Sequence, residues 1–475
     1  MRTVLNHVGG RDVPAASGAT LVDLGPATGE PIATIPESGP ADVDLAVEAA
    51  RTALAGPWGR STTAERADLC DAVADAIQAR FDELAELESL DTGKPVRTAR
   101  AIDIPRAIAN FRFFAGAVRH DQTGAHEMAD ALNYTLRRPL GVVALITPWN
   151  LPLYLLSWKA APALACGNAV IAKPSEMTPL TASALASIVT GVGAPAGVFN
   201  VLHGTGGSVG TPLVSHPGVR GVSFTGGTMT GAKVAAAAAP AFKKLSLELG
   251  GKNATVVFAD ATFDEAVAGT ARAGFTNTGQ ICLCGSRVLV EASIHDRFVE
   301  ALVERVRALR QGDPLDPATE VGALVSAAHL DKVEGYLRLA EQEGGTIRCG
   351  GRRPARRGFF LEPTIVSGLS ASCRTATEEI FGPVLTVHPF RDEAEALAMA
   401  NGVRYGLSAS VWTNDLRRAH RVSAALEVGM VWVNTWLKRD LRVPFGGVKD
   451  SGVGREGGAH SLSFYTDDKN VCIQY

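Results

Sequence analysis

The segment GVVALITPWNLPLYLLSWKAAPALACGNAVIAKP, residues 141–174, decides the fold class. A short apolar run, VVALIT, leads through a proline-containing turn into a longer stretch rich in alanine and leucine, and a second short run, AVIAKP, follows. The same alternation continues through PLTASALASIVTGVG, VFNVLHG, GVSFTGG and MTGAKVAAAAA. Short β-rich runs that alternate with helical stretches predict a parallel sheet with helices on both faces, which is a doubly wound α/β domain.

A second alternating series occupies about residues 247–434 and contains ATVVFAD, SRVLVEA, PVLTVHPF, SASVWTND and GMVWVNT. It predicts a second α/β domain, because 475 residues are too many for one hydrophobic core. Ahead of both series, apolar residues at three- and four-residue spacing predict one long amphipathic helix over residues 65–90, ended by Gly93 and Pro95. Strand-like patches in residues 119–138 and at the C-terminus belong to neither series, and such appendages are expected to pair across subunits.

The totals of the chain exclude several classes of protein. With 46 basic and 49 acidic residues the net charge is −3, so neither nucleic acid nor an anionic membrane is expected as a partner. No apolar run approaches the length of a membrane span, and the N-terminus lacks the apolar core of a signal peptide. Seven thinly scattered cysteines favour free thiols in a reducing cytoplasm. Cys282 and Cys284 have no second cysteine pair or histidine cluster near them in sequence, so no metal site is predicted.

The stretch FTNTGQICLCGSRV, residues 275–288, contains the candidate nucleophile. A nucleophilic thiolate needs exposure and polar or electropositive surroundings. Cys282 follows Gly279 and Gln280, where a substrate can approach the backbone closely, whereas Cys284 lies deeper in an apolar run. A single cysteine is more often a small buried apolar residue, so Cys282 needs catalytic partners before it can be assigned a role.

Two other polar residues follow predicted strands and are candidates for those partners. Glu248, in LSLELGGKN, stands between two leucines and before two glycines, so burial should raise its pKa towards the range of a general base. The alternative is a carboxylate at a strand edge that forms a salt bridge. Asn150, in ITPWNLP, has a side-chain amide suited to a developing oxyanion. Its alternative is to cap the helix that follows.

Glycine-rich turns and one charged turn indicate a dinucleotide. FTGGTMTG follows a strand and offers backbone amides at a helix N-terminus, which suits a pyrophosphate. HGTGGSVG also follows a strand, but its spacing G-x-G-x-x-x-G is one residue longer than the usual fingerprint, so it is better interpreted as packing between sheet and helix near the cofactor than as the main phosphate site. Lys173 and Glu176, in AKPSE, are placed to reach the hydroxyl groups of an adenosine ribose. A carboxylate at that point favours NAD over NADP, although an ordinary charged loop gives the same pattern.

Seven motifs together resemble the aldehyde dehydrogenase family. In chain order they are TPWNLP, KPSE, FTGGTMTG, LELGGKN, GQIC, EEIFGPV and PFGGVKDSGVGREGG, within residues 65–469. The resemblance implies an NAD-binding domain (residues 1–118 and 139–247) and a catalytic domain (residues 248–450). It also implies oligomerisation elements at residues 119–138 and 451–475. These would form a small β-hairpin and a C-terminal strand that crosses to a neighbouring subunit, in a homodimer or homotetramer.

The resemblance also implies a mechanism and a set of NAD contacts. The Cys282 thiolate attacks the aldehyde carbon, and the Asn150 amide and the Cys282 N–H stabilise the oxyanion. Hydride then passes to the nicotinamide, and Glu248 activates the water that hydrolyses the thioester. Gly227 departs from the family, many of whose members have serine there. The expected NAD contacts are Thr147, Pro148, Trp149, Lys173, Glu176, Gly226, Gly227, Gly231, Leu249, Glu379 and Phe381.

Two arginines suggest the substrate. Arg112, in NFRFF, and Arg442, in NTWLKRDLRVPFGG, are predicted to bind a carboxylate near the substrate tunnel, because a guanidinium fork matches a carboxylate. The alternative is a structural salt bridge, for instance with Asp440 or Asp103. The flanking sequences resemble the branch of the family that oxidises 2-hydroxymuconate and 2-aminomuconate semialdehydes, which implies an acidic, unsaturated semialdehyde. A betaine-aldehyde or general aliphatic aldehyde dehydrogenase, an esterase or acyltransferase that uses the same cysteine, and a catalytically silent relative are the other hypotheses.

Overall fold

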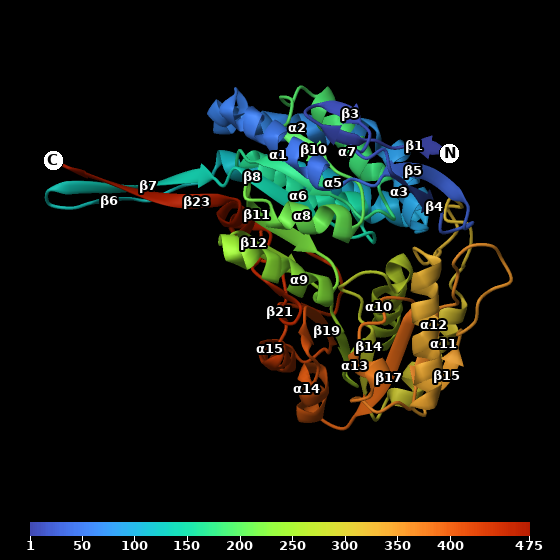
Figure 1. Ribbon diagram of the computed structural model, residues 1–475. Helices are drawn as coiled ribbons and strands as arrows, with labels where there is room; N and C mark the ends of the chain where they lie inside the picture. Colours follow the sequence, from blue (N-terminus) through green and yellow to red (C-terminus); the bar gives the residue numbers. More distant parts are fainter.

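Two twisted β-sheets, each flanked by helices, form the two lobes of the computed structural model, which covers residues 1–475 (Figure 1). The sheets correspond to the two alternating series of the sequence, so the prediction of two doubly wound α/β domains is confirmed. A three-stranded β arm projects from the upper lobe and carries the C-terminus at its tip (Figure 1). No helix is both long and apolar enough to span a membrane.

The first sheet has eight strands and is parallel through its centre. Every residue of Val142–Ile146 and of Ala169–Lys173 is buried, because helices cover both faces of the sheet. The strands, in spatial order, are β22 (Gly452–Val453), β12 (Lys244–Glu248), β11 (Val219–Thr225), β8 (Val142–Ile146), β9 (Ala169–Lys173), β10 (Phe199–Val201), β2 (Asn6–Val8) and β3 (Arg11–Val13). The accompanying helices are α1 (Pro40–Ala55), α6 (Pro152–Ala165), α7 (Leu180–Gly191), η3 (Gly206–Gly210), α8 (Thr211–Ser215), α9 (Thr228–Ala238) and η4 (Ala239–Ala241).

The second sheet has seven strands, of which only β15 runs antiparallel to its neighbour. Its strands, in spatial order, are β15 (Thr346–Cys349), β16 (Thr364–Ser367), β17 (Val384–Phe390), β14 (Arg287–Glu291), β13 (Ala254–Val257), β19 (Ser408–Trp412) and β20 (Met430–Val433). The helices of this lobe are α10 (Phe263–Phe275), η5 (Thr276–Gly279), α11 (His295–Arg307), α12 (Ala327–Gln342), α13 (Arg374–Thr377), α14 (Glu393–Asn401) and α15 (Leu416–Ala425). The short strands β18 (Tyr405–Gly406) and β21 (Val448–Lys449) pair beside it.

The predicted single helix over residues 65–90 is two helices, α2 (Thr63–Ala79) and α3 (Phe81–Thr92). Arg80 interrupts them with a non-helical backbone (φ −108°, ψ 25°), and its guanidinium reaches forward to Glu83 at 2.7 Å. The apolar spacing continues across this break, so it leaves no mark in the periodicity. The predicted end is confirmed, because Gly93 adopts the left-handed conformation (φ 74°) that closes a helix.

The remaining elements complete the upper lobe. The helix α5 packs between α2 and α6. The remaining elements of the upper lobe are η1 (Trp58–Arg60), α4 (Val96–Thr98), η2 (Ala99–Asp103), α5 (Ile104–Arg119) and a small sheet of β1 (Arg2–Thr3), β5 (Pro31–Pro36) and β4 (Thr20–Leu24).

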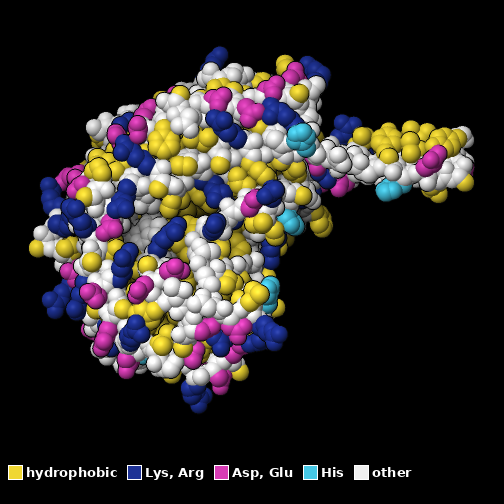
Figure 2. Space-filling view, turned by 180° about the vertical axis from the view of Figure 1, so that it is seen from behind, with side chains coloured by type: hydrophobic (Ala, Val, Ile, Leu, Met, Phe, Trp, Pro, Cys, Tyr) yellow, Lys and Arg dark blue, Asp and Glu magenta, His cyan; other side chains and the backbone are white.

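The arm consists of the hairpin β6 (Ala125–Glu127) and β7 (Ala131–Pro139) with the last strand, β23 (Thr466–Gln474), paired along β7. The pairing runs from Thr466 opposite Pro139 to Gln474 opposite Ala131. Only the last part of residues 451–475 therefore lies in the arm, since β22 joins the first sheet and α16 (Gly458–Phe464) packs on the lobe. Figure 2 shows hydrophobic side chains gathered along one face of the arm.

Candidate active site

The segment that carries Cys282 begins with a left-handed turn. Helix α10 ends at Phe275, and Asn277, Thr278 and Gly279 then all have positive φ (53°, 57° and 71°). Glycine is required at the last position, because a Cβ there would lie 2.2 Å from the Gly382 carbonyl oxygen. A β-branched threonine at positive φ is strained, and such strain persists only where surrounding contacts hold it. The turn directs the following residues into the space between the two lobes.

The carbonyl groups after this turn are held by side-chain donors. Asn150 Nδ2 donates to the Gln280 carbonyl at 2.9 Å, and Asn253 Nδ2 donates to the carbonyls of Cys282 (2.7 Å) and Cys284 (2.9 Å). The Cys282 N–H donates to no acceptor within the chain. The backbone of the cysteine is thus fixed by its carbonyls while its N–H stays free for a ligand.

The two cysteines differ in access. Cys282 is partly exposed and lines a cavity of about 260 Å³, whereas Cys284 is 6% exposed and its Sγ lies 3.9 Å from the Thr276 carbonyl oxygen. Burial raises the pKa of both thiols, to about 12 for Cys284. For Cys282, the negative charges of Glu379 and Glu248 raise the pKa further, and Arg439 opposes them. The resting thiol is therefore protonated, and its attack on a carbonyl carbon requires a base.

Glu248 has the burial expected of the predicted base. It ends β12, is 3% exposed, and neither of its carboxylate oxygens has a hydrogen-bond partner. Burial raises its pKa well above the ordinary value, and Glu456 raises it further, while Lys159 acts against both. Glu456 is itself held by Lys159 Nζ at 2.7 Å. The direction of the shift agrees with the sequence prediction that desolvation tunes this carboxyl group.

Two adjoining cavities form a groove along the carboxyl ends of the first sheet. The larger, of about 630 Å³, reaches Lys173 and Glu176, and the smaller reaches Cys282 and Asn150. They share the residues Pro148, Trp149, Thr225, Gly226 and Gly227. Carboxyl ends of parallel strands are the usual ligand position in such folds.

All predicted cofactor residues except Gly231 line this groove. A Cβ on Gly231 would lie 2.4 Å from Leu249 Cδ2, so the absence of a side chain lets α9 pack closely against the segment after β12. The structure therefore places Gly231 in close packing behind the groove, and a direct contact with the cofactor stays a prediction. A short loop cannot reveal from spacing alone which of its glycines face the ligand.

The groove fits a dinucleotide. Buried polar atoms without partners face it or lie beside it, namely Thr147 Oγ1, Asn150 Oδ1 and Thr225 Oγ1. The Glu379 carboxylate lies against Gly250, where a Cβ would come within 2.2 Å of Oε2, and it accepts from the Gly251 N–H at 2.9 Å. Lys173 Nζ contacts Glu176 at 3.1 Å at the far end.

A separate cavity of about 610 Å³ contains a group of arginines. Arg439 lies between the rings of Trp158 (4.5 Å) and Phe445 (4.3 Å), and its Nε and Nη2 are buried without an acceptor. Arg106 lies 5.7 Å from the ring of Tyr154 and forms no ion pair, although the charge of Asp440 in the same cavity acts on it. Burial is the main cause that lowers the pKa of Arg106, and the positive charge of Arg439 lowers it further. The two guanidinium groups therefore repel each other.

The two arginines predicted from the sequence are placed differently. Arg112 lies on the outer face of α5, is exposed, and pairs with Asp75 at 2.9 Å, so it does not line the cavity. Arg442 stands at the cavity mouth, but Asp440 holds its guanidinium at 2.9 and 2.7 Å. The salt-bridge alternative is therefore the observed state of both, with Asp75 in place of Asp103 for Arg112.

The sequence did not single out Arg106 and Arg439, which line this cavity. A signal for the first existed, because Ile102, Arg106, Ala109 and Phe113 recur at helical spacing and share the face of the α5 segment that lines the cavity. Arg439 stands only three residues before Arg442 in an irregular loop, where no periodicity indicates which side chain turns inward.

The fold and the site define an oxidoreductase that binds a dinucleotide in one α/β domain and presents a thiol from the other. The chain belongs to the aldehyde dehydrogenase family, whose family model matches residues 13–471.

Several relatives resemble the chain over its full length. It is 49% identical over 485 aligned positions to the 2-hydroxymuconic semialdehyde dehydrogenase of Pseudomonas sp. strain CF600, covering 100% of both chains. It is 47% identical to the 2-aminomuconic semialdehyde dehydrogenase of Danio rerio, covering 99% of this chain and 98% of the relative. The crystal structure of PnpE from Pseudomonas sp. WBC-3 with nicotinamide adenine dinucleotide superposes with a TM-score of 0.97 at 42% identity, covering 99% and 97% of the two chains.

Proposed function

We propose that the protein oxidises a semialdehyde with a carboxylate at its far end, of the 2-hydroxymuconate or 2-aminomuconate type, to the dicarboxylic acid with NAD. The observation that carries this proposal is the pair of guanidinium groups, Arg106 and Arg439, which line one cavity between the two lobes without an ion-pair partner, and Arg439 Nε and Nη2 are buried without an acceptor. Both arginines are half-buried, and a cation that is partly removed from water without a partner is costly, so a substrate carboxylate would relieve that cost. The names of the semialdehyde dehydrogenases aligned above support the same substrate class.

Cys282 acts as the nucleophile in this proposal. Its Sγ attacks the aldehyde carbon, and Glu248 accepts the proton that the thiol must lose. The free Cys282 N–H and the second hydrogen of the Asn150 amide, whose first is bound to Gln280, donate to the oxyanion. Each such donor is worth about 3–4 kcal/mol in the transition state. Glu248 passes that proton to solvent, and its carboxylate then takes a proton from the water that releases the acid from Cys282.

NAD is the proposed cofactor, and when bound it accepts the hydride that the substrate loses. Thr147, Trp149, Gly226 and Gly227 would hold its pyrophosphate and nicotinamide side, and Glu379 would hold the nicotinamide ribose. Glu176 would accept from the adenosine ribose, where its charge repels the additional phosphate of NADP. PnpE, a close structural relative, was crystallised with the same dinucleotide.

The test compares 2-hydroxymuconate semialdehyde, hexanal and betaine aldehyde in the parent and in arginine variants. Arg439→Met keeps the apolar contacts of the side chain, and we expect it to raise KM for the semialdehyde about 10- to 100-fold, because a charge-assisted hydrogen bond contributes roughly 1.5–3 kcal/mol. Hexanal turnover should stay within about twofold, since it makes no such bond. Arg106→Met should behave alike, and Arg112→Met is the matched control. A parent that prefers hexanal or betaine aldehyde would contradict the proposal.

We also propose that the arm assembles the chain into a homodimer or homotetramer in the cytoplasm. Met128, Ile473 and Tyr475 of the arm are at least half exposed, and apolar side chains on an extended arm are typical of a surface covered by another subunit. Light scattering on a chain truncated after Tyr465 tests this. A truncated chain that keeps the oligomeric state of the parent would contradict it.

A further inference from the structure

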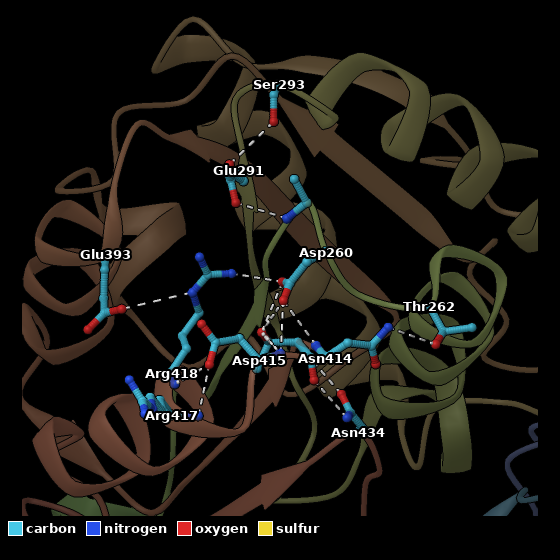
Figure 3. Close-up of polar contacts among 12 residues, drawn as sticks. Asp260, Thr262, Glu291, Ser293, Glu393, Asn414, Asp415, Arg417, Arg418 and Asn434 are labelled. Carbon is cyan, nitrogen blue, oxygen red and sulfur yellow. Dashed lines mark hydrogen bonds and ion pairs between the residues drawn. The ribbon is translucent and has the colours of Figure 1, made fainter.

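The loop that carries Arg439 connects β20 with Phe445 and is fixed at its root. Asn434 has positive φ (51°), and its side chain both accepts from the Thr413 N–H (3.0 Å) and donates to the Thr413 carbonyl (2.8 Å). Thr413 Oγ1 in turn donates to the Asp260 carboxylate at 2.9 Å. Figure 3 shows Asp260 at the centre of this network, where it also binds Arg418 at 2.8 Å. The loop therefore starts from a rigid edge of the second sheet.

Two indole groups fix the loop further along. Trp432 Nε1 donates to the Lys438 carbonyl at 2.8 Å, which ties the loop back to strand β20. Trp436 is 3% exposed, and its Nε1 donates to the carbonyl of Leu283 at 2.9 Å. Leu283 is the residue directly after the nucleophile. This hydrogen bond thus joins the loop that carries Arg439 to the residue next to Cys282, and Arg439 follows Trp436 by three positions.

We propose that Trp436 is a positioning residue that fixes the span between the anion-binding guanidinium group of Arg439 and the sulfur of Cys282, so that the enzyme selects substrates by the separation of carboxylate and aldehyde. This inference rests on the proposed function. It adds a length criterion, which the presence of a carboxylate-binding arginine alone does not supply.

The physical reason is the steep dependence of attack on distance. Reacting atoms must come within about 3–3.5 Å in good alignment, and a misplacement of about 1 Å costs about 100-fold in rate. In a substrate bound by its carboxylate, the chain length sets the distance from the carboxylate to the aldehyde carbon. One carbon–carbon bond is about 1.5 Å long. A rigid span therefore accepts one length well and its neighbours poorly, whereas a loose loop accommodates several.

The experiment measures kcat/KM with NAD for straight-chain semialdehyde acids of four, five, six and seven carbons, and for neutral alkanals of the same lengths. In the parent we expect one acid to exceed its neighbours by about tenfold or more, as expected for a change of about 1.4 kcal/mol in the barrier, with no such peak among the alkanals. Trp436→Phe keeps an aromatic ring but loses the donor. It should reduce the peak to about threefold or less and leave alkanal values within about twofold of the parent.

Two further variants make the test decisive. Trp412→Phe is the matched control, because the buried Trp412 Nε1 has no hydrogen-bond partner. The same exchange there removes no hydrogen bond, so this variant should retain the peak. Asn434→Gly tolerates the positive φ but loses both bonds to Thr413, and it should flatten the peak as Trp436→Phe does, even if the latter fails to fold.

The failures of the two proposals are distinguishable. If the parent shows the peak and both loop variants keep it, or if they lose activity equally with acids and alkanals of every length, the positioning role is wrong and the substrate class stands. If the parent prefers alkanals over acids at every length, the proposed function fails, and the length criterion fails with it.

Discussion

The cofactor groove and the arginine cavity are built in different ways. The groove is lined by glycine-rich turns and by residues such as Trp149, Lys173 and Glu176 that follow the carboxyl ends of β8 and β9, and threonine hydroxyls without a partner lie at or beside it. The arginine cavity is lined by long side chains from α5, α10 and the loop after β20, which no strand register holds in common. The first region offers fixed donors to a ligand of constant shape, and the second offers adjustable charge to a variable one. Chemistry common to all aldehydes should therefore depend on the first region, and choice of aldehyde on the second.

The sharpest test of that division is the nucleophile. Cys282→Ala should lower kcat by about 10⁴-fold or more with semialdehyde and hexanal alike, because no other group forms the covalent bond. NAD binding, followed by quenching of protein fluorescence, should be unchanged. Cys284→Ala is the control and should retain most activity, since its buried sulfur faces the Thr276 carbonyl rather than the groove. If Cys282→Ala lowered kcat with one aldehyde but not with the other, the division of roles between the groove and the arginine cavity would be wrong.

The general base should have the next largest effect. Glu248→Gln should lower kcat by about 10²- to 10⁴-fold and trap an acyl adduct on Cys282, detectable by intact mass after one turnover. Because burial and Glu456 raise the pKa of Glu248, kcat/KM of the parent should rise with pH through a limb above the ordinary glutamate range. Removal of the neighbouring charge in Glu456→Gln should move that limb to lower pH. If neither Glu248→Gln nor Glu456→Gln altered the rise of kcat/KM with pH, another group would be the base.

These two regions also differ in how much the sequence could predict. The groove residues follow strand ends in short motifs, so local spacing places them near the groove. Gly231 lies behind it, because close packing behind a turn and contact in front of it both favour glycine. Arg106 and Arg112 lie about 120° apart around one helix, and the face that meets a cavity is decided by a loop some 330 residues later. The break at Arg80 was invisible for a related reason, since apolar spacing continued through it. Contacts between distant segments carry no local signal.

Cofactor choice tests the groove at its outer end. Glu176→Gln should narrow the ratio of kcat/KM between NAD and NADP by about tenfold, because removal of one like charge near a phosphate is worth roughly 1–1.4 kcal/mol in partly solvated surroundings. Glu176 is about one-third exposed and already contacts Lys173, which limits the effect. Initial rates with both dinucleotides at saturating semialdehyde measure it. Equal use of NAD and NADP by the parent would show that this carboxylate does not discriminate.

The smallest expected effect concerns two adjacent glycines of the groove. Gly227 is the N-cap of α9, has an ordinary extended backbone (φ −68°, ψ 145°), and a Cβ there would meet no atom within 4 Å. Gly227→Ser should therefore fit, cap the helix and add a hydroxyl donor towards the pyrophosphate, which lowers KM for NAD by about two- to threefold. The same exchange at Gly226 places a Cβ 2.5 Å from the Phe224 ring and should raise KM. Both glycines belong to one motif, and only their surroundings differ. A lower KM for NAD in Gly227→Ser and a higher one in Gly226→Ser would therefore show that backbone geometry, not motif identity, decides which side chains the groove accepts. An increase in KM for both variants would instead mean that any side chain on this turn obstructs the dinucleotide.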